Sequence, residues 1–185
     1  DVGLTDLTSF AKYEVTGIDS HALLERVCAN RVPAKDGAVV LSQMLTPLGG
    51  IESEATVTRL TKDHYYLLSG AVAELHDFDW LVQHIEPGED VAVRNVTDDY
   101  GVLVLSGPKS REVLSSLTDA GLANEDGFTW MSAKEITVSE IAIRALRVSY
   151  VGELGWELHC SMDRLADLHD ALMQAGAPQG IRRFG

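Results

Sequence analysis

A tyrosine and a glutamate stand on either side of a glycine-framed segment in the last third of the chain. Tyr150 precedes Gly152, and Glu157 follows Gly155. The segment up to Tyr150 is typical of a strand, and residues 156–160 alternate apolar and polar side chains, which predicts that Glu157 points away from the apolar face. The glycines allow the backbone to turn back between the two strands. Such a carboxylate either faces solvent or accepts N–H hydrogen bonds from a ligand; the residues alone favour solvent and leave the ligand open.

Other reactive side chains give weaker signals. His76, Asp77 and Asp79 are close enough in sequence for a metal site, but a third ligand on the same helical face is missing, which favours exposed or capped side chains. Residues 107–110 contain glycine, lysine and serine without the glycine spacing of a phosphate loop. The chain has no Ser-His-Asp arrangement and no G-x-S-x-G motif, so we expect no serine nucleophile.

Composition narrows the class of protein. The chain has 185 residues, 45% of them hydrophobic, and a net charge of -13, which disfavours nucleic acid and anionic membranes as partners. Two distant cysteines, Cys28 and Cys160, form no CxxC or zinc pattern and are expected to be small buried side chains in a reducing compartment. No stretch has the length of a membrane span or the layout of a signal peptide. We therefore expect a soluble protein of the cytoplasm, or of the mitochondrial matrix in a eukaryote.

Strand and helix patterns interleave along the chain. Helices are expected over 20–28 and 71–85, from Pro108 onward, and up to Gly176, where Leu165, Leu168 and Leu172 would face inward. The expected strands are 12–16, 39–45, 54–60, 64–69, 91–95, 102–105, 135–138 and 142–150. Hairpins are expected across 46–50 and 97–101. This order predicts an α+β fold of mostly antiparallel sheets with flanking helices, favoured over a doubly wound parallel sheet.

The expected helix over 71–85 has an apolar stripe of four residues, which are Leu75, Phe78, Val82 and Ile85. Trp80 lies on the other side of that helix. Two interpretations remain open for it. The tryptophan is either partly covered by its own chain, which is favoured, or forms a contact with another domain or subunit.

Four segments, in order, carry a resemblance that covers nearly the whole chain. They are 6–17, 49–60, 105–114 and 150–158, the last reading Tyr-Val-Gly-Glu-Leu-Gly-Trp-Glu-Leu. In these segments the chain resembles the folate-binding aminomethyltransferase family, which includes the glycine cleavage T-protein and the carboxy-terminal regions of dimethylglycine and sarcosine dehydrogenases and oxidases. The last segment favours the dimethylglycine and sarcosine branch. The resemblance implies one folate-binding domain over 1–185, cut at both ends, with a subdomain boundary expected near 101–107.

The resemblance implies roles for individual residues. Glu157 matches the glutamate that pairs with the N–H and amino donors of the pterin ring, and Tyr150 matches a tyrosine of the same pocket. Leu68 and Thr56 match positions that line this cavity. Glu54 stands where the family has its central catalytic aspartate, so its carboxylate is kept and lengthened by one methylene.

A second departure from the family is Gly70, which replaces a pocket asparagine of the T-protein. Glu54 and Gly70 change the expected site, whereas the four segments that carry the resemblance are present. A catalytic group that is displaced by about 1 Å can cost roughly 100-fold in rate.

The resemblance also implies a reaction and its partners. The cofactor is tetrahydrofolate, and FAD is expected on a separate domain or subunit that oxidises an N-methyl amine. The resulting iminium or formaldehyde would be trapped as 5,10-methylenetetrahydrofolate, which makes the chain the aminomethyltransferase-like part of an amine dehydrogenase or oxidase.

Two other functions remain open. One is a non-catalytic folate-binding or assembly module that retains the fold. The other is a tetrahydrofolate-dependent demethylase. Related folate proteins with a Lys-Gly-Cys motif are disfavoured, because residues 150–152 read Tyr-Val-Gly.

Overall fold

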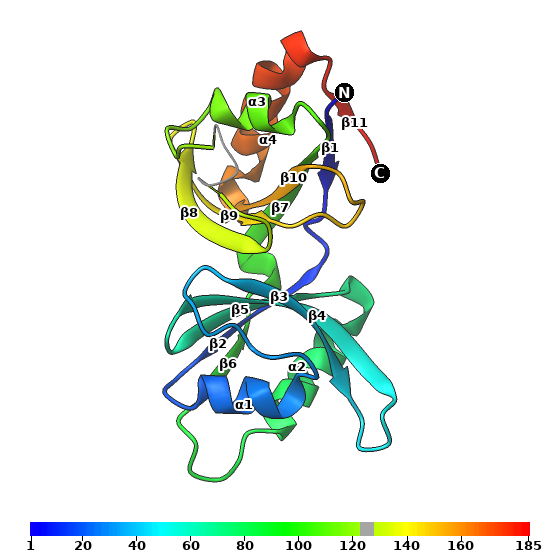
Figure 1. The fold of residues 1–185 in the computed structure, drawn as a ribbon, viewed down its shortest axis with the longest axis vertical. Helices are drawn as coiled ribbons and strands as arrows, with labels where there is room; N and C mark the ends of the chain where they lie inside the picture. Colours follow the sequence, from blue (N-terminus) through cyan, green and yellow to red (C-terminus); the bar gives the residue numbers. More distant parts are fainter. Residues whose placement is uncertain (123–127) are drawn as a thin grey trace. The chain divides into compact units, whose positions relative to one another are not determined.

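The computed structural model describes residues 1–122 and 128–185, which form two compact units. One unit is Ser9–Thr97, here called the 9–97 unit. The other consists of Asp1–Thr8 and Asp98–Gly185 and is called the terminal unit, since it holds both chain ends. In each unit, helices cover one face of a mainly antiparallel sheet (Figure 1). The predicted α+β class is confirmed.

The 9–97 unit has a five-stranded sheet in the order β3-β4-β5-β2-β6. Its strands are β2 (Ala11–Thr16), β3 (Val39–Leu45), β4 (Ile51–Thr61), β5 (His64–Ser69) and β6 (Ala92–Asn95). Its helices are α1 (Ser20–Val27), the 3₁₀ turn η1 (Ala71–Ala73) and α2 (Glu74–Gln83). Leu23 and Leu24 of α1 and Leu81 of α2 are fully buried against Ala55 and Val57 of β4. Both helices therefore lie on the face of β4 that carries its odd-numbered residues.

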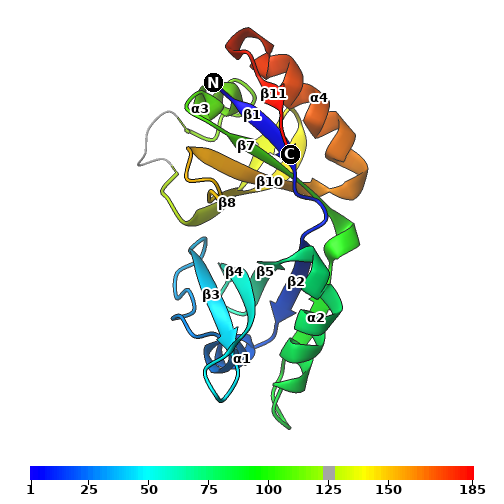
Figure 2. The same ribbon diagram turned by 90° about the vertical axis from the view of Figure 1, so that its right-hand side faces the viewer.

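The terminal unit has a six-stranded sheet in the order β11-β1-β7-β10-β9-β8. Its strands are β1 (Gly3–Asp6), β7 (Tyr100–Ser106), β8 (Ser132–Val138), β9 (Ile141–Arg147), β10 (Gly155–Ser161) and β11 (Arg182–Arg183). The helical segments are η2 (Thr97–Asp99) at the boundary, α3 (Ser110–Ser115), η4 (Met162–Arg164), α4 (Leu165–Gly176) and η5 (Ala177–Gln179). Leu168 and Leu172 of α4 are fully buried with Trp156 and Leu158 of β10, which confirms the predicted inner face of this helix. Figure 2 shows α4 beside this sheet.

The two units repeat one order of elements. The 9–97 unit runs β2-α1-β3-β4-β5-α2, and the terminal unit runs β7-α3-β8-β9-β10-α4. Each repeat is preceded by a strand that pairs with the other repeat: β1 precedes the first repeat and pairs with β7 of the second, and β6 precedes the second repeat and pairs with β2 of the first, both antiparallel. The chain is therefore an internal duplication whose halves exchange their first strands.

Matching hydrogen bonds align the repeats about 90 residues apart. Leu7 N donates to Val102 O at 2.9 Å, and Val96 N donates to Lys12 O at the same distance. The Val102 amide also donates to the Thr8 hydroxyl at 3.0 Å, and the Lys12 amide donates to the Thr97 hydroxyl at the same distance. Lys12 and Val102 are therefore equivalent positions, and this equivalence extends along the neighbouring strands.

The strand exchange explains why one predicted hairpin is wrong. Residues 91–95 and 102–105 do form strands, but β6 belongs to the five-stranded sheet and β7 to the six-stranded sheet, so 97–101 does not join partners. The units divide between Thr97 and Asp98, a few residues before the region 101–107, and again between Thr8 and Ser9. The hairpin across 46–50 is confirmed, with Gly49 at φ +80°.

The predicted apolar stripe of the helix over 71–85 is confirmed for Phe78 and Ile85, which pack against the core, and is wrong for Leu75 and Val82. Leu75 is 74% exposed and Val82 41% exposed, whereas Asp77 and Leu81 are buried. The reason is a buried hydrogen bond, because the Ser53 hydroxyl donates to Asp77 Oδ2 at 2.7 Å and turns that row of the helix toward the sheet. Trp80 is half-buried against the apolar core of the 9–97 unit, which confirms that its own chain partly covers it.

Helix α3 begins at Ser110, so Pro108 lies in the preceding turn rather than at the first helical position. The geometry of that turn is set by Gly107 at φ +117°. No helix in residues 1–122 and 128–185 is long and apolar enough to cross a bilayer.

Both cysteines are free thiols, and burial raises the pKa of each, Cys28 and Cys160, to about 11. Since an unfolded thiol has a pKa near 8.5, the folded chain at pH 8 should hold far less reactive thiolate. We expect alkylation of the native chain to be roughly 100-fold slower or more than that of the urea-unfolded chain. Iodoacetamide kinetics followed by mass spectrometry measure both rates, and native rates within about tenfold of the unfolded ones would contradict the expectation.

Candidate functional site

Three of the five predicted site residues lie on one face of the five-stranded sheet. Thr56 of β4 is directly opposite Leu68 of β5 in the strand register. Glu54 precedes Thr56 by two residues on β4 and therefore shares its face. This face is the opposite of the one that Ala55 and Val57 present to the helices. The structure therefore brings these three side chains together within the 9–97 unit.

The environments of these three residues differ. Leu68 is buried and Thr56 half-buried, whereas Glu54 is exposed. Glu54 Oε2 accepts a hydrogen bond from Gln43 Nε2 at 2.5 Å, and Gln43 is its direct partner on β3. Gly70 follows β5, and a Cβ at this position would meet no heavy atom within 4 Å. Position 70 therefore has room for a Cβ.

Glu157 lies on β10 in the terminal unit with its side chain on the face opposite the core. Its neighbours in sequence, Trp156 and Leu158, are fully buried among the apolar residues under α3 and α4. Glu157 pairs with Val104 on one side and Leu146 on the other, and 12% of its side chain is exposed. The predicted orientation is confirmed. The carboxylate lies between two apolar neighbours with only a small part of its surface open.

Tyr150 lies in a longer connection than the sequence suggested. Strand β9 ends at Arg147 and β10 begins at Gly155, so the predicted strand over 142–150 stops three residues early. The ladder between these strands ends at the Leu146–Glu157 pair, and the residues beyond it leave the sheet, with Gly152 at φ +79°. Tyr150 is 96% exposed. The two residues that frame this segment are therefore not cross-strand partners.

The internal duplication relates the two groups of site residues. In one unit Lys12 pairs with Leu68, and in the other Val102, the equivalent of Lys12, pairs with His159. Leu68 and His159 are thus equivalent, and by the same register Tyr66 is equivalent to Glu157. Glu54, Thr56, Leu68 and Glu157 all come from the helix-free faces of equivalent sheets.

The sequence interpretation did not assign two polar residues near Glu157. His159 is 1% exposed, and its Nε2 lies 3.4 Å from Glu157 Oε2. Arg144 is the cross-strand partner of His159, and its Nε donates to Glu135 Oε1 at 2.7 Å. The signal that could have found His159 is the alternation of β10, which puts residues 157 and 159 on one face.

The histidine considered for a metal site is held between carboxylates. His76 Nε2 is 2.8 Å from Glu52 Oε1, and Nδ1 is 3.0 Å from Oδ1 of the buried Asp77. Asp79 is exposed. Among residues 1–122 and 128–185, no group of three or more histidine, cysteine, aspartate or glutamate side chains could hold a metal ion. His76 instead joins α2 to β4.

These contacts predict a pH dependence of stability. Hydrogen bonds to Asp77 first, and then to Glu52, raise the pKa of His76 above its ordinary value. A histidine whose pKa is higher in the folded state stabilises the fold when it is protonated. This stabilisation is fully present at a pH below the unfolded-state pKa near 6.5, and it is lost as the pH rises through the raised folded-state pKa. Since 48% of the His76 side chain is exposed, we expect less than about 1 kcal/mol. Urea unfolding of the parent and of His76→Gln should differ more at pH 5.5 than at pH 8.5, and equal differences would contradict this.

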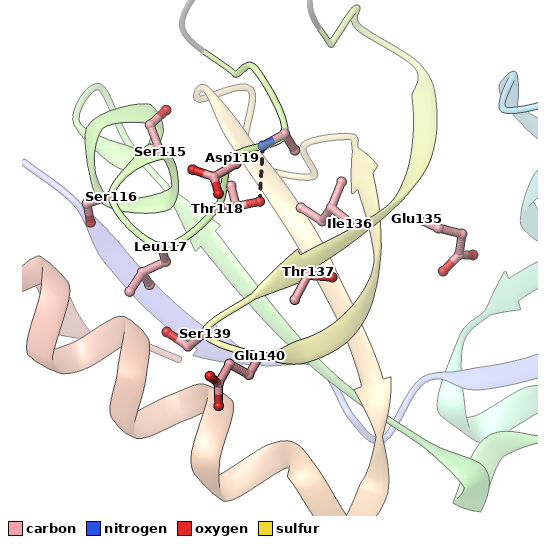
Figure 3. A pocket seen from close by; sticks show the side chains of 11 residues that line it. Ser115, Ser116, Leu117, Thr118, Asp119, Glu135, Ile136, Thr137, Ser139 and Glu140 are labelled. Atoms are coloured by element: carbon pink, nitrogen blue, oxygen red, sulfur yellow. Dashed lines mark hydrogen bonds between the residues drawn. The ribbon is translucent and has the colours of Figure 1, made fainter.

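The described part of the terminal unit has at least three open hollows, two of them larger than the third, which has about 480 Å³. Figure 3 shows one of about 580 Å³, lined mainly by hydroxyl and carboxylate side chains of Ser115–Ala120 and of β8 with the turn after it, where the Thr118 hydroxyl accepts from the Ala120 amide. Another has about 560 Å³ and is lined by Trp130, Arg147 and the segment 152–155, among others. Neither of these two hollows is lined by any of the five predicted site residues.

Comparison with known proteins decides the family. Residues 1–185 match the model of the GCVT N-terminal domain. The chain belongs to this family. The resemblance found in the sequence is thereby confirmed, over the whole length of the chain.

Individual relatives point to the same family. The chain is 41% identical over 185 residues to the mitochondrial dimethylglycine dehydrogenase of Rattus norvegicus, which covers 100% of this chain and 21% of that protein. It is 33% identical over 185 residues to the aminomethyltransferase of Chloroherpeton thalassium, covering 100% of this chain and 50% of that protein. The chain therefore spans about a fifth of the length of the dehydrogenase.

A solved structure shows the fold. The glycine cleavage system aminomethyltransferase T from Bartonella henselae superposes with a TM-score of 0.83 and 23% identity, covering 100% of this chain and 48% of that protein. At this identity the match establishes the architecture of the chain and not its chemistry.

Proposed function

We propose that the chain binds tetrahydrofolate and is the one-carbon acceptor part of a dimethylglycine or sarcosine dehydrogenase-like enzyme. Its product would be 5,10-methylenetetrahydrofolate, formed from an iminium or formaldehyde intermediate. The observation that carries the proposal is the Glu157 carboxylate, which lies on the helix-free face of β10 between Val104 and Leu146 with 12% of its side chain exposed.

This environment fits the edge of a pterin ring. The ring presents adjacent N–H donors on one edge, and a carboxylate can accept both in a charge-assisted pair of hydrogen bonds. The apolar side chains of Val104 and Leu146 on either side limit the water that competes for those bonds. Glu157 is therefore assigned the recognition of the pterin.

The other predicted residues take supporting roles in this proposal. Leu68 and Thr56, which lie on the helix-free face of the 9–97 unit, would contact the folate, and Tyr150 would border or stack on the flat ring. Glu54 would accept a hydrogen bond from a folate nitrogen and promote the loss of that nitrogen's proton. The hydrogen bond from Gln43 to Glu54 would hold the carboxylate in place. Tetrahydrofolate supplies the two nucleophilic nitrogens that take up the one-carbon unit, and their two protons leave with the released amine if the donor is an iminium, or in the released water if it is formaldehyde. The chain contributes proximity and shelter from water.

The proposal includes partners outside the chain. Oxidation of the N-methyl amine requires a flavin, and we place FAD on a separate domain or subunit. The proposal excludes nucleic acid and membranes as partners and places the protein in the mitochondrial matrix in a eukaryote, or in the cytoplasm otherwise.

One observation favours a second candidate function, a folate-binding or assembly module without catalysis. Glu54 is exposed and bonded to Gln43, and Gly70 offers no side chain. A module of this kind would keep Glu157 and bind folate without accelerating transfer. A tetrahydrofolate-dependent demethylase is the third candidate, and a flavin-binding fold upstream in the same gene would count against it.

Anaerobic calorimetric titration of the chain with tetrahydrofolate tests the proposal. The expected result is saturable binding with one site per chain, and a flat titration would contradict it. Catalysis is tested by adding formaldehyde and measuring 5,10-methylenetetrahydrofolate with a coupled dehydrogenase. If the parent forms 5,10-methylenetetrahydrofolate faster than the uncatalysed reaction and Glu54→Gln does not, the chain is an enzyme. If the parent binds tetrahydrofolate without accelerating the reaction, the chain is a binding module.

A further inference from the structure

A buried histidine lies beside Glu157 on the same face of β10. His159 is 1% exposed, and its Nε2 is 3.4 Å from Glu157 Oε2. An ionised carboxylate can only accept hydrogen bonds, so the hydrogen of this bond must be on Nε2 of the imidazole. With the carboxylate ionised, the contact assigns a hydrogen to Nε2 of His159. At 3.4 Å the contact is long for a hydrogen bond.

The internal duplication shows what this position requires for packing alone. The residue equivalent to His159 in the 9–97 unit is Leu68, which is also buried, at 4% exposure. The residue equivalent to Glu157 is Tyr66, which is fully buried. The same place in the same fold is thus filled by an apolar side chain, so the polar imidazole at 159 is not needed to complete the sheet.

We propose that His159 is a positioning residue that orients the Glu157 carboxylate for the pterin edge. This inference rests on the proposed function, because it assumes that Glu157 is the residue that recognises the pterin. A buried polar side chain usually has a hydrogen-bond partner, and Glu157 is the partner of His159 on its own strand.

The geometry leaves the carboxylate free to bind a ligand while it is held. Each carboxylate oxygen has two lone pairs, so Oε2 can accept from His159 and from one ligand N–H, while Oε1 accepts from a second. The imidazole, itself buried in the sheet face, restricts rotation of the carboxylate about its last bond. Less conformational entropy of the Glu157 side chain is therefore lost when the ligand binds, and this preorganisation raises the affinity.

Three variants test this role by anaerobic calorimetry with tetrahydrofolate. His159→Leu copies the residue at the equivalent position, so it should fold, and it should weaken binding about tenfold. His159→Gln keeps an N–H donor of similar reach and should recover most of the affinity. The matched control is His169→Leu on α4, which should bind tetrahydrofolate as the parent does. Unchanged binding by His159→Leu would overturn the inference.

A double-mutant cycle separates positioning from a general structural effect. In a Glu157→Gln background the carboxylate is already absent, so adding His159→Leu should cost less than about twofold more. A full tenfold further loss in that background would show that His159 acts independently of Glu157, and the inference would be wrong.

A measurement without folate keeps the inference distinct from the proposed function. Nitrogen NMR of the histidine-labelled chain should show Nε2–H at His159 and a changed ring signal in Glu157→Gln; an Nε2 without hydrogen in the parent would overturn the inference whatever binds. A parent chain that shows Nε2–H and a flat folate titration refutes the proposed function, and the positioning role with it. If the parent binds folate and His159→Leu binds it equally well, only the positioning role of His159 is refuted.

Discussion

Replacing Glu157 with glutamine is expected to weaken tetrahydrofolate binding by at least about tenfold and up to roughly 100-fold. The amide keeps one acceptor oxygen but places an NH₂ donor against a donor of the pterin edge. It also removes the negative charge that strengthens both hydrogen bonds. Calorimetric titration of the parent and Glu157→Gln under the same anaerobic conditions measures the ratio of dissociation constants.

The matched control is Glu153→Gln, which removes one negative charge from an exposed position in the segment before β10. This variant should bind tetrahydrofolate within about twofold of the parent, because an exposed charge is screened by water and salt. Equal losses in Glu153→Gln and Glu157→Gln would show that only net charge matters, and the specific role of Glu157 would be refuted.

The largest effect on stability is expected from Gly17→Ala. Gly17 has φ +117°, where a residue with a Cβ is strained, and its added Cβ would overlap the carbonyl oxygen of Asp90. The equivalent Gly107 also has φ +117°, and its Cβ would be 2.7 Å from the carbonyl oxygen of Asp1. Gly17 follows β2 and approaches the residues just before β6, and Gly107 follows β7 and approaches the residues just before β1. We expect Gly17→Ala to lower the free energy of unfolding by about 3 kcal/mol or more.

Gly88→Ala separates backbone strain from overlap. Gly88 also has a positive φ, +94°, but an added Cβ would meet nothing within 4 Å. Its cost should be limited to the strain of a positive φ, about 1–2 kcal/mol. Urea unfolding followed by circular dichroism gives both values. Similar losses in Gly17→Ala and Gly88→Ala would show that the close approach to Asp90 does not matter.

Local patterns were enough to predict the elements that depend on neighbours in sequence. The hairpin across 46–50 follows from two β-rich runs around glycines, and the outward orientation of Glu157 follows from strict alternation along β10. The inner face of α4 was likewise visible in the spacing of its leucines. In each case one periodicity dominates and no distant partner has to be known.

The errors arose where a distant partner decides the structure. The strands β6 and β7 look like a hairpin in sequence, but they pair with β2 and β1 through the exchange of first strands. The helix over 71–85 has an apolar stripe, yet the bond from Ser53 turns Asp77 inward and leaves Leu75 exposed. Periodicity reports which residues could be buried and not which partner is available to bury them.

The candidate site divides in the same way. The helix-free faces that carry Glu54, Thr56, Leu68 and Glu157 follow from strand alternation once the sheets are known. The contact between Glu157 and His159 does not, because two polar residues two positions apart are equally typical of an exposed strand face. The exposed Tyr150 shows that a short glycine-framed sequence need not form a tight turn.

The most direct measurement of the central claim is a crystal structure of the chain with reduced folate bound. Both carboxylate oxygens of Glu157 should lie at about 2.7–2.9 Å from nitrogen atoms of the pterin edge. A folate bound at another place, with the Glu157 carboxylate facing only water, would show that Glu157 does not recognise the pterin, although the family and the fold of the chain would be unchanged.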